Sequence, residues 1–371
     1  MAHSDDDIAM MRIALRMARR GLGTTAPNPS VGAVITDPDT GEVIARGWTQ
    51  PGGRPHAETE AIRRAGPRAR GATLYSTLEP CSHHGKTPPC ADAIIKAGIA
   101  RVVAGVLDPN AVVAGQGYAR LRAAGVEVTT GVCEAEARHL TLGHIRRVTS
   151  RRPFVRLKVA VDADGFVPRG TAGRPLWISS PEARARAHLL RAESDAILVG
   201  RGTVVADNPE LTCRLPGLEH RSPLRVILAS HLDIPVACTL IATARSRRTT
   251  VLCLHDAPED REAALVAAGA TVVRTAASST GRLDLAAVLQ HLSEAGITRV
   301  LVEGGTTVLG GFLDRLADEL VVVQSSDRLP PAVRLRPFGD RMIGDLGRLG
   351  WETAERHRVG PDTLTIYRPK S

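Results

Sequence analysis

Apolar and polar positions alternate along the chain with helical and strand periods in turn. After Ser4, the residues Ile8, Met11, Leu15 and Ala18 recur at helical spacing, and the acidic residues between them would favour a helix that Ser4 caps. The pattern then predicts strands at 31–35, 42–46, 72–77, 101–106 and 126–130, with helices at 57–65, 91–97 and 118–124. Such alternation is typical of an α/β layered sheet.

A polar stretch with a proline at residues 149–153 interrupts this pattern, and a second α/β alternation follows it. Segments of this kind are common between domains, so we expect two domains that span residues 1–148 and 153–371. In the second domain we expect strands at 154–161, 196–199, 224–228, 250–254, 271–273, 299–302 and 319–324, with helices at 181–191, 260–268, 285–295 and 308–315.

Length and composition agree with a globular protein of two domains. The chain has 371 residues, of which 43% are hydrophobic and 23% charged, a balance that argues against disorder. Its start lacks the basic and apolar regions of a secretory signal, and no apolar run approaches the roughly 18 residues of a membrane span. Six cysteines at irregular spacing do not make a disulfide framework. We therefore expect a cytoplasmic protein with no membrane partner.

The net charge of +9 raises the question of a nucleic-acid partner. Residues 1–150 carry +4 of this charge and residues 151–371 carry +5, so the excess is spread over both domains. Aromatic residues, on which single-stranded bases would stack, make up only 3% of the chain. We expect no nucleic-acid partner, although the composition alone leaves RNA binding open.

His56, Cys81 and Cys90 form a candidate metal site with Glu58 beside it. One His and two Cys supply three protein ligands to Zn²⁺ and leave the fourth position for water, as a catalytic zinc requires. Zinc lowers the pKa of that water toward roughly 7. Each ligand is expected to begin a helix, where a thiolate is favoured. Glu58 is not a ligand and is placed to move protons between the water and a leaving amine.

The order of these residues matches in part the pattern H-x-E followed by P-C-x-x-C of zinc nucleobase deaminases. Eight residues instead of two separate the cysteines. Taken singly, His56 could be a surface residue and either cysteine a core residue, but together with Glu58 they indicate one zinc ion per chain. The remaining cysteines have no neighbouring ligand pattern and are expected in the core: Cys133, Cys213, Cys238 and Cys253.

The insert between the cysteines accounts for the unusual spacing. Residues 77–90, together with residues 28–32, 56–58 and 108–110, closely resemble the deaminase half of the bifunctional riboflavin-biosynthesis deaminase–reductases, and the similarity continues over nearly the whole chain. The resemblance implies a cytidine-deaminase-like zinc domain followed by a dihydrofolate-reductase-like domain. It also implies hydrolytic deamination of a phosphoribosylamino-pyrimidine, then NADPH-dependent reduction of the ribosyl group to ribityl.

By matching position, the resemblance implies a deaminase pocket lined by Asn28, His83, Lys86, Asp108 and Asn110. A lysine ammonium is a natural partner for the substrate phosphate, although Lys86 alone would be interpreted as a solvated surface residue. Two positions differ from the family pattern. Ala111 replaces a Pro, and Gln116 replaces a Lys, a change that would weaken charge contacts with a phosphate.

Residues 300–307 in the second domain combine a strand, two glycines and a helix start. Backbone N–H groups in such a turn can approach a pyrophosphate closely. The turn alone could also be a tight strand-to-helix connection, and no complete G-x-G-x-x-G fingerprint follows a strand. Resemblance to the family's reductase half favours a cofactor site. It implies NADPH contacts from Ala160, Trp177, Thr203, Asp207, Ser230, Gly305, Thr306, Thr307, Val308, Leu309, Gly310 and Gly311.

The same resemblance implies substrate contacts from Lys158, Arg191, Leu211, Arg214 and Glu303. Two arginines suit a phosphate because the forked guanidinium donors can bind it bidentately. Hydride would pass from NADPH to C1′ of the ring-opened ribose, and the protein would supply the alignment.

Three positions of the second domain depart from the family pattern. Asp162 replaces a Ser, Pro175 replaces a substrate-binding Ser, and Asn208 replaces the second Asp of a pair. Pro175 can donate no hydrogen bond, and Asp162 would repel an anionic ligand if it pointed into the site. The stretch 327–337 is also unlike the family.

Two alternatives remain open beside the bifunctional enzyme. In one, the deaminase is active and the second domain is a non-reducing scaffold. In the other, which belongs to a different class, the chain is an RNA-binding or RNA-editing zinc protein. The sequence does not decide the oligomeric state, and a homo-oligomer is compatible with the leading hypothesis.

Overall fold

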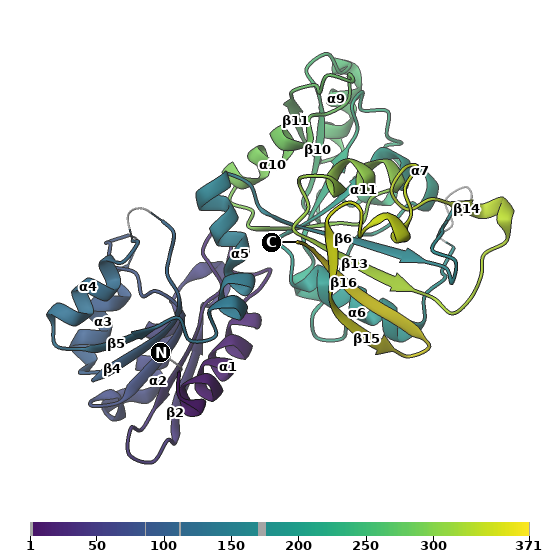
Figure 1. Ribbon diagram of the computed structural model, residues 1–371. Coiled ribbons are helices and arrows are strands. Elements are labelled where there is room, and N and C mark those ends of the chain that lie inside the picture. The colour runs from purple at the N-terminus through teal and green to yellow at the C-terminus, as the bar shows by residue number, and fades with distance from the viewer. Residues whose placement is uncertain (1–2, 86, 111–112, 170–175, 371) are drawn as a thin grey trace. The chain divides into compact units, whose positions relative to one another are not determined.

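The structure, a computed structural model, describes residues 3–85, 87–110, 113–169 and 176–370 (Figure 1). The chain forms two compact units, Met1–Pro153 and Phe154–Ser371. Each unit has its own sheet, with one hydrophobic core in the first unit and two in the second. No helix among the described residues is long and apolar enough to cross a membrane.

The first unit is a three-layer α/β sandwich. Among its described residues, a five-stranded sheet has the order β2-β1-β3-β4-β5, and β3, β4 and β5 run parallel. Strand β1 is antiparallel to both β2 and β3. The elements are α1 (Asp5–Arg19), β1 (Gly32–Thr36), β2 (Val43–Trp48), α2 (Ala57–Ala65), β3 (Thr73–Leu78), α3 (Cys90–Ala97), β4 (Arg101–Val106), α4 (Gln116–Ala123), β5 (Glu127–Thr130) and α5 (Glu134–Ser150).

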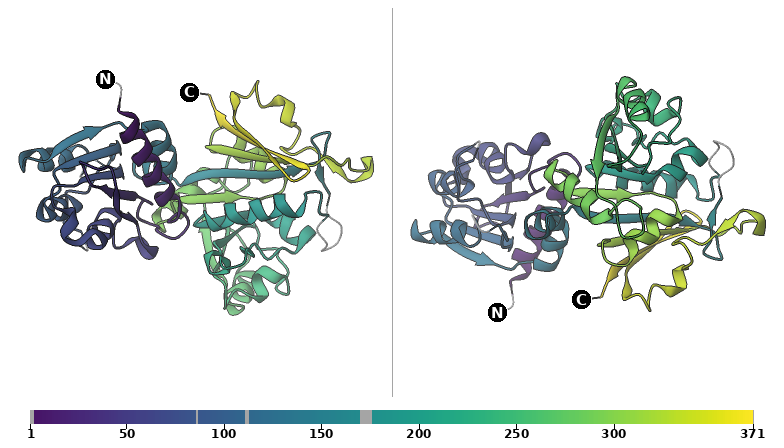
Figure 2. Two further views of the ribbon diagram at one scale, coloured as in Figure 1. Left: turned by 90° about the horizontal axis from the view of Figure 1, so that it is seen from below. Right: turned by 90° about the horizontal axis from the view of Figure 1, so that it is seen from above.

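Two glycines let helices rest directly on opposite faces of this sheet (Figure 2). Ala33 pairs with Gly47 across β1 and β2, so Gly32 and Gly47 face opposite sides. A Cβ on Gly32 would lie 1.9 Å from the carbonyl oxygen of Ala14 in α1. A Cβ on Gly47 would lie 2.3 Å from that of Ala57 in α2. Helix α2 is thereby fixed on the sheet at the point where it begins, next to His56.

The second unit contains a nine-stranded sheet among its described residues, in the order β11-β10-β9-β8-β12-β6-β13-β16-β15. The strands from β11 to β13 are parallel, and the hairpin β16–β15 adds two antiparallel strands at one edge (Figure 2). The elements are β6 (Phe154–Val161), β7 (Val167–Pro168), α6 (Pro181–Ala192), β8 (Ala196–Gly200), α7 (Arg201–Asp207), β9 (Leu224–Leu228), α8 (Thr239–Ala242), β10 (Thr249–Leu254), α9 (Glu259–Ala267), β11 (Thr271–Thr275), α10 (Leu285–Glu294), β12 (Arg299–Val302), α11 (Thr306–Leu313), β13 (Glu319–Gln324), β14 (Arg334–Leu335), β15 (Trp351–Val359) and β16 (Asp362–Pro369).

Alternate residues of the central strands belong to two separate hydrophobic cores, one on each face of the second sheet. In β8, Leu198 belongs to the core that includes α10 and α11, whereas Ile197 and Val199 belong to the core that includes α6 and α8. Because strand side chains alternate between faces, a run of apolar residues such as β8 must be buried on both sides. Helices therefore cover both faces, as expected for an α/β unit.

The predicted elements are found within a few residues of their expected bounds, and Ser4 caps α1 by accepting the Asp7 N–H. Several elements were not predicted, among them α8 and the short strands β7 and β14. Helix α5 fills residues 134–150, so the expected linker is helical up to Ser150. The short helix α7 follows β8 directly. The β15–β16 hairpin closes one edge of the sheet, and seven of the nine residues of β15 are exposed, so its sequence lacks the apolar alternation that marks a half-buried strand.

We expect Gly32→Ala to destabilise the first unit. The added methyl group would collide with the backbone of α1, and overpacking of this kind costs about 1–3 kcal/mol. Urea unfolding followed by circular dichroism should show the loss. Gly344→Ala is the control, because nothing lies within 4 Å of a Cβ at that position. Equal unfolding midpoints for the two variants would contradict the expected contact between α1 and β1.

Candidate active sites

The N-terminal ends of α2 and α3 bring His56, Cys81 and Cys90 together. His56 is the N-cap of α2, and Cys90 is the first residue of α3. His56 Nδ1 lies 3.3 Å from Cys90 Sγ and 3.7 Å from Cys81 Sγ, and the three ligand atoms lie within 4.8 Å of one another. Tetrahedral zinc with these ligand types would hold its N and S ligand atoms about 3.6 Å apart. The observed spacing therefore fits a Zn²⁺ ion.

Cys81 departs from the expectation that each ligand begins a helix. It lies in the loop after β3, and its Sγ accepts a hydrogen bond from the backbone N–H of Cys90 at 3.2 Å. The Cys90 thiol, His56 and this N–H together lower the pKa of Cys81 to about 4, although burial opposes the shift. The start of α3 thus favours the thiolate form, which is the form that binds zinc.

Glu58 lies in the first turn of α2 and is only 3% exposed. Burial raises the pKa of this carboxyl group. Ser76 Oγ lies 3.2 Å from Glu58 Oε1 and 2.8 Å from the carbonyl oxygen of Leu78. A hydroxyl has one proton, so Ser76 can donate it to an ionised Glu58, or donate to Leu78 and accept a bond from a protonated Glu58. Both protonation states of Glu58 therefore have a partner.

The other residues predicted for the deaminase pocket differ in how they are held. Asn28 Nδ2 donates to the carbonyl oxygen of Gly53 at 2.8 Å, which ties Asn28 to the loop that leads to His56. His83 is exposed in the loop between the two cysteines. Lys86 and the departure at position 111 lie outside the described residues, and Gln116 is exposed at the start of α4.

Asp108 is held by other residues of the protein. Its carboxylate is buried and lies 3.0 Å from Nε2 of His144 in α5, while it accepts the backbone N–H of Asn110 at 2.9 Å. These bonds fix the turn at residues 108–110. Asp108 therefore orients Asn110, and His144 is a supporting residue that the sequence pattern did not reveal.

Glu79 is a second residue that sequence reasoning did not single out. Its buried carboxylate accepts backbone N–H groups from Gly117 at 2.9 Å and Gly115 at 3.0 Å, and from Asp108 and Tyr118 at 3.4 Å. One side chain next to the zinc-ligand loop thus anchors the segment that carries Asn110. The available signal was an acidic residue directly after a strand, two positions before Cys81.

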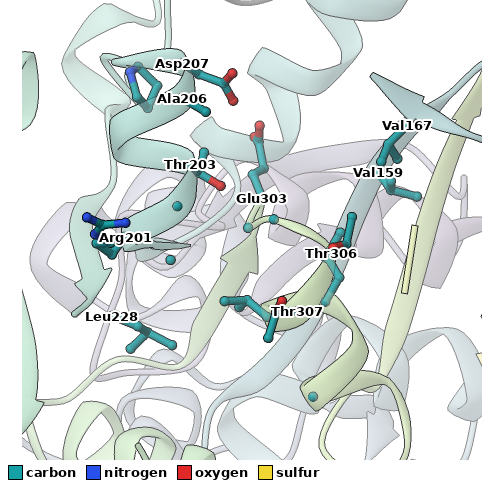
Figure 3. A pocket seen from close by; sticks show the side chains of 18 of the residues that line it. Val159, Val167, Arg201, Thr203, Ala206, Asp207, Leu228, Glu303, Thr306 and Thr307 are labelled. Atoms are coloured by element: carbon teal, nitrogen blue, oxygen red, sulfur yellow. The ribbon is translucent and has the colours of Figure 1, made fainter. Parts of the chain in front are cut away.

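A cavity of about 1400 Å³ lies at the carboxyl ends of β6, β8, β9 and β12 in the second unit (Figure 3). Ligands bind at this end of the strands in open α/β sheets. The cavity is lined by the following predicted residues: Lys158, Ala160, Trp177, Arg191, Thr203, Asp207, Leu211, Arg214, Ser230, Glu303, Gly305, Thr306, Thr307, Val308, Leu309 and Gly311.

Gly310 is the exception among the residues predicted to face the cofactor. Its carbonyl oxygen accepts a hydrogen bond from Arg341 Nη2 at 2.8 Å, and a Cβ there would lie 3.1 Å from the backbone of Phe338. Neighbouring residues of a helix point in different directions. Gly310 therefore faces the core behind α11, while Leu309 and Gly311 line the cavity.

Glu303 joins two cations at the floor of the cavity. Arg191 donates Nε and Nη2 to the two oxygens of Glu303, each at 2.9 Å, and Lys158 Nζ lies 4.0 Å from Glu303 Oε2. Burial alone would raise the pKa of Glu303, but Arg191 and Lys158 outweigh it and lower that pKa to about 2. The bidentate fork of Arg191 thus holds Glu303, whereas the expected phosphate contact would need the fork to face the substrate.

The turn between β12 and α11 can accept an anion. Gly305 is the N-cap of α11, and no side chain caps the first N–H groups of this helix in the described structure. A Cβ on Gly304 would lie 2.9 Å from Val308 Cβ, so the turn is too tight for a larger residue. Trp177 is 59% exposed at the cavity wall and offers a face for a planar ring. These features fit a nicotinamide dinucleotide.

Residues 4–106 match the family profile of the cytidine and deoxycytidylate deaminase zinc-binding region, and residues 153–327 match that of the RibD C-terminal domain. The chain is 39% identical to the riboflavin biosynthesis protein RibD of Aquifex aeolicus, over 96% of the chain and 97% of that relative. It is 42% identical to RibD of Bacillus amyloliquefaciens, over 97% of the chain and 95% of that relative. The chain belongs to the RibD family.

Solved structures of RibD proteins match this chain over nearly its whole length. Acinetobacter baumannii RibD superposes with a TM-score of 0.85 at 33% identity and covers 99% of each chain. A Thermotoga maritima protein, described as a diaminohydroxyphosphoribosylaminopyrimidine deaminase and 5-amino-6-(5-phosphoribosylamino)uracil reductase, has a TM-score of 0.83 at 35% identity over 98% of this chain and 99% of its own. The predicted fold class is confirmed, and the chain is a bifunctional deaminase–reductase of riboflavin biosynthesis.

Two of the departures from the RibD pattern have structural explanations, and Pro175 lies outside the described residues. Asp162 is fully buried and accepts the backbone N–H groups of Asp164, Phe166 and Leu329, so it does not face the cavity. Asn208 has φ of 41°, a left-handed conformation that Asn tolerates better than most residues. Its Oδ1 accepts the Thr239 N–H at 2.7 Å, so it joins α7 to α8.

We expect Glu79→Gln to weaken substrate binding by the deaminase half. An amide nitrogen would face some of the four N–H donors, and an unmatched buried donor costs about 1–3 kcal/mol. The Michaelis constant for deamination should rise, while elemental analysis should still find zinc. Reduction by the second unit serves as the internal control for folding. An unchanged Michaelis constant would contradict the anchoring role.

Proposed function

We propose that the chain deaminates 2,5-diamino-6-(5-phosphoribosylamino)pyrimidin-4-one and then reduces the ribosyl group of the product to ribityl. We assign the deamination to residues 1–148, with one Zn²⁺ held by His56, Cys81 and Cys90, and the reduction to residues 153–371, with NADPH. The observation that carries the proposal is the convergence of three zinc ligands beside a buried, proton-accepting Glu58. The description of the Thermotoga maritima relative supports the choice of substrate.

Glu58 would transfer the protons of the deamination. Zn²⁺, when bound, would supply an activated water as the nucleophile. Glu58 would take a proton from that water and deliver it to the amine, which leaves as ammonia while the ring carbon gains oxygen. Burial raises the pKa of Glu58, a shift that favours the step in which this carboxyl group carries the proton. Ser76 would stabilise Glu58 in both states.

Residues next to the zinc ligands would position the pyrimidine. Asn110 is oriented by Asp108, and Asn28 is tied to the loop before His56. His83 and Lys86 belong to the loop between the two cysteines, and they would contact the ribosyl phosphate as the family resemblance implies. In this assignment Asp108 acts through Asn110 rather than by direct contact.

The second unit would align the ring-opened ribose against the cofactor. NADPH, when bound, would supply the hydride that reaches C1′. Arg214, which is 43% exposed at the cavity wall, is the arginine that we assign to the substrate phosphate, since Arg191 grips Glu303. Leu211 would line the substrate site, and the charged pair of Lys158 and Glu303 would lie beside the substrate. Ala160, Thr203, Asp207 and Ser230 would border the cofactor, with its pyrophosphate at the start of α11.

Product analysis tests both halves of the proposal together. Incubation with the pyrimidine substrate alone should raise its mass by about one unit, as an amino group is exchanged for oxygen, and addition of NADPH should raise it by about two more. NADPH absorbance should fall in step with the second product. Deamination without NADPH oxidation would instead support a second unit that acts only as a scaffold.

Glu58→Gln tests the proton transfer. This variant should retain about one zinc per chain, because Glu58 is not a ligand, yet deamination should fall roughly 10²- to 10⁴-fold. Reduction of the separately supplied deaminated intermediate should continue, which shows that the chain is folded. Loss of zinc from the variant would show that Glu58 has a role in metal binding.

A further inference from the structure

Arg201 and Asp233 form an ion pair on the wall of the cavity in the second unit. Arg201 is the first residue of α7, directly after β8, and Asp233 lies in the loop after β9. Arg201 Nε lies 2.9 Å from Asp233 Oδ2 and donates to the Asp233 carbonyl oxygen at 3.2 Å. The two side chains remain 47% and 42% exposed. The pair is therefore accessible to a ligand in the cavity.

Asp233 contacts only one edge of the Arg201 guanidinium group. Its contacts to Asp233 use Nε, and no described residue forms a hydrogen bond with either Nη atom. Four N–H donors therefore remain for a ligand. By contrast, Lys158 and Arg191 face Glu303, and Arg214 contacts Glu210 and Thr212.

The strand order indicates which part of a dinucleotide would reach Arg201. In the proposed function the substrate lies beside Lys158 of β6 and Glu303 after β12, so the nicotinamide that reduces it would lie next to these residues. The pyrophosphate would lie at the start of α11. The sheet continues from β6 through β12 and β8 to β9, a span of roughly 14 Å at the usual strand spacing. An extended dinucleotide would therefore place its adenosine over β8 and β9. Figure 3 shows Arg201 and Leu228 on this side of the cavity, and Val159 on the opposite side.

We propose that Arg201, positioned by Asp233, binds the 2′-phosphate of the adenosine ribose and thereby gives the reductase its preference for NADPH over NADH. The proposal rests on the proposed reductase function. A phosphate monoester is the only group that distinguishes the two cofactors, and a guanidinium fork binds such a group bidentately. Asp233 limits the conformations of Arg201, so less entropy is lost when the phosphate binds.

Binding of adenosine phosphates tests this assignment without turnover. Calorimetry on the full chain would compare 2′,5′-ADP, which carries the 2′-phosphate, with ADP, which lacks it. Arg201→Ala should weaken binding of 2′,5′-ADP roughly 10- to 100-fold, the range expected for lost hydrogen bonds to a charged group, and should leave ADP nearly unchanged. Arg201→Lys should recover part of the loss, because it restores the charge without the fork. Asp233→Ala should cause a smaller loss with the same selectivity for 2′,5′-ADP.

Arg282→Ala is the matched control, because Arg282 is also an exposed arginine on the cavity wall. Its loss should affect both ligands by the same small factor, as expected for a general charge effect. A selective loss of 2′,5′-ADP binding in Arg282→Ala, with none in Arg201→Ala, would overturn the proposal.

Steady-state kinetics separate this proposal from the proposed function. The Michaelis constant for NADPH should rise in Arg201→Ala while that for NADH stays the same. If the unaltered chain oxidises NADPH and Arg201→Ala keeps the original cofactor preference, only the assignment of Arg201 fails. If the unaltered chain oxidises neither cofactor, the proposed reductase function fails.

Discussion

A carboxylate that leaves water must find hydrogen-bond donors inside the protein, and in this chain the donors belong to the loops that carry the functional residues. Glu79 gathers four backbone N–H groups and orders the segment next to the zinc ligands. Asp162 accepts three N–H groups in the second unit, and two of them, from Asp164 and Phe166, belong to the turn that leads to Val167 on the cavity wall. In both units, therefore, a buried acidic residue orders backbone segments next to the candidate site.

This constraint explains what the sequence could and could not predict. Strands β8 and β4 are runs of apolar residues because they are buried on both faces, so they could be predicted from the sequence. The zinc ligands could be predicted because His and Cys occur in a characteristic order. Glu79 and His144 belong to no such pattern. Glu79 binds backbone N–H groups and His144 binds the Asp108 carboxylate, and these partners are distant in the sequence and become neighbours only in the folded chain. Helix α5 and strand β15 were missed because neither has a regular apolar stripe. Gly310 was assigned to the cofactor by its motif, and only the packing of α11 against Phe338 shows that it faces away.

The two units use charged and polar side chains in different ways. In the first, the start of α3 lowers the pKa of the Cys81 thiol, and burial raises the pKa of the Glu58 carboxyl group. In the second, Arg191 and Lys158 keep Glu303 ionised at the base of a large cavity, and the strand ends provide an extended floor. The site in the first unit thus depends on the pKa values of its side chains. The site in the second unit depends on the shape of the cavity and on the positions of its charged side chains.

Strand β15 has a consequence for the behaviour of the protein at high concentration. It lies at the end of the nine-stranded sheet, where the open edge could recruit a strand from another molecule. Glu352, Glu355, Arg356 and Arg358 cover it with charge, and its register with β16 shifts between Thr353 and Glu355. An incoming strand would have to desolvate these charges and match an irregular ladder. The charged residues that made β15 hard to recognise in the sequence therefore also disfavour strand pairing at this edge.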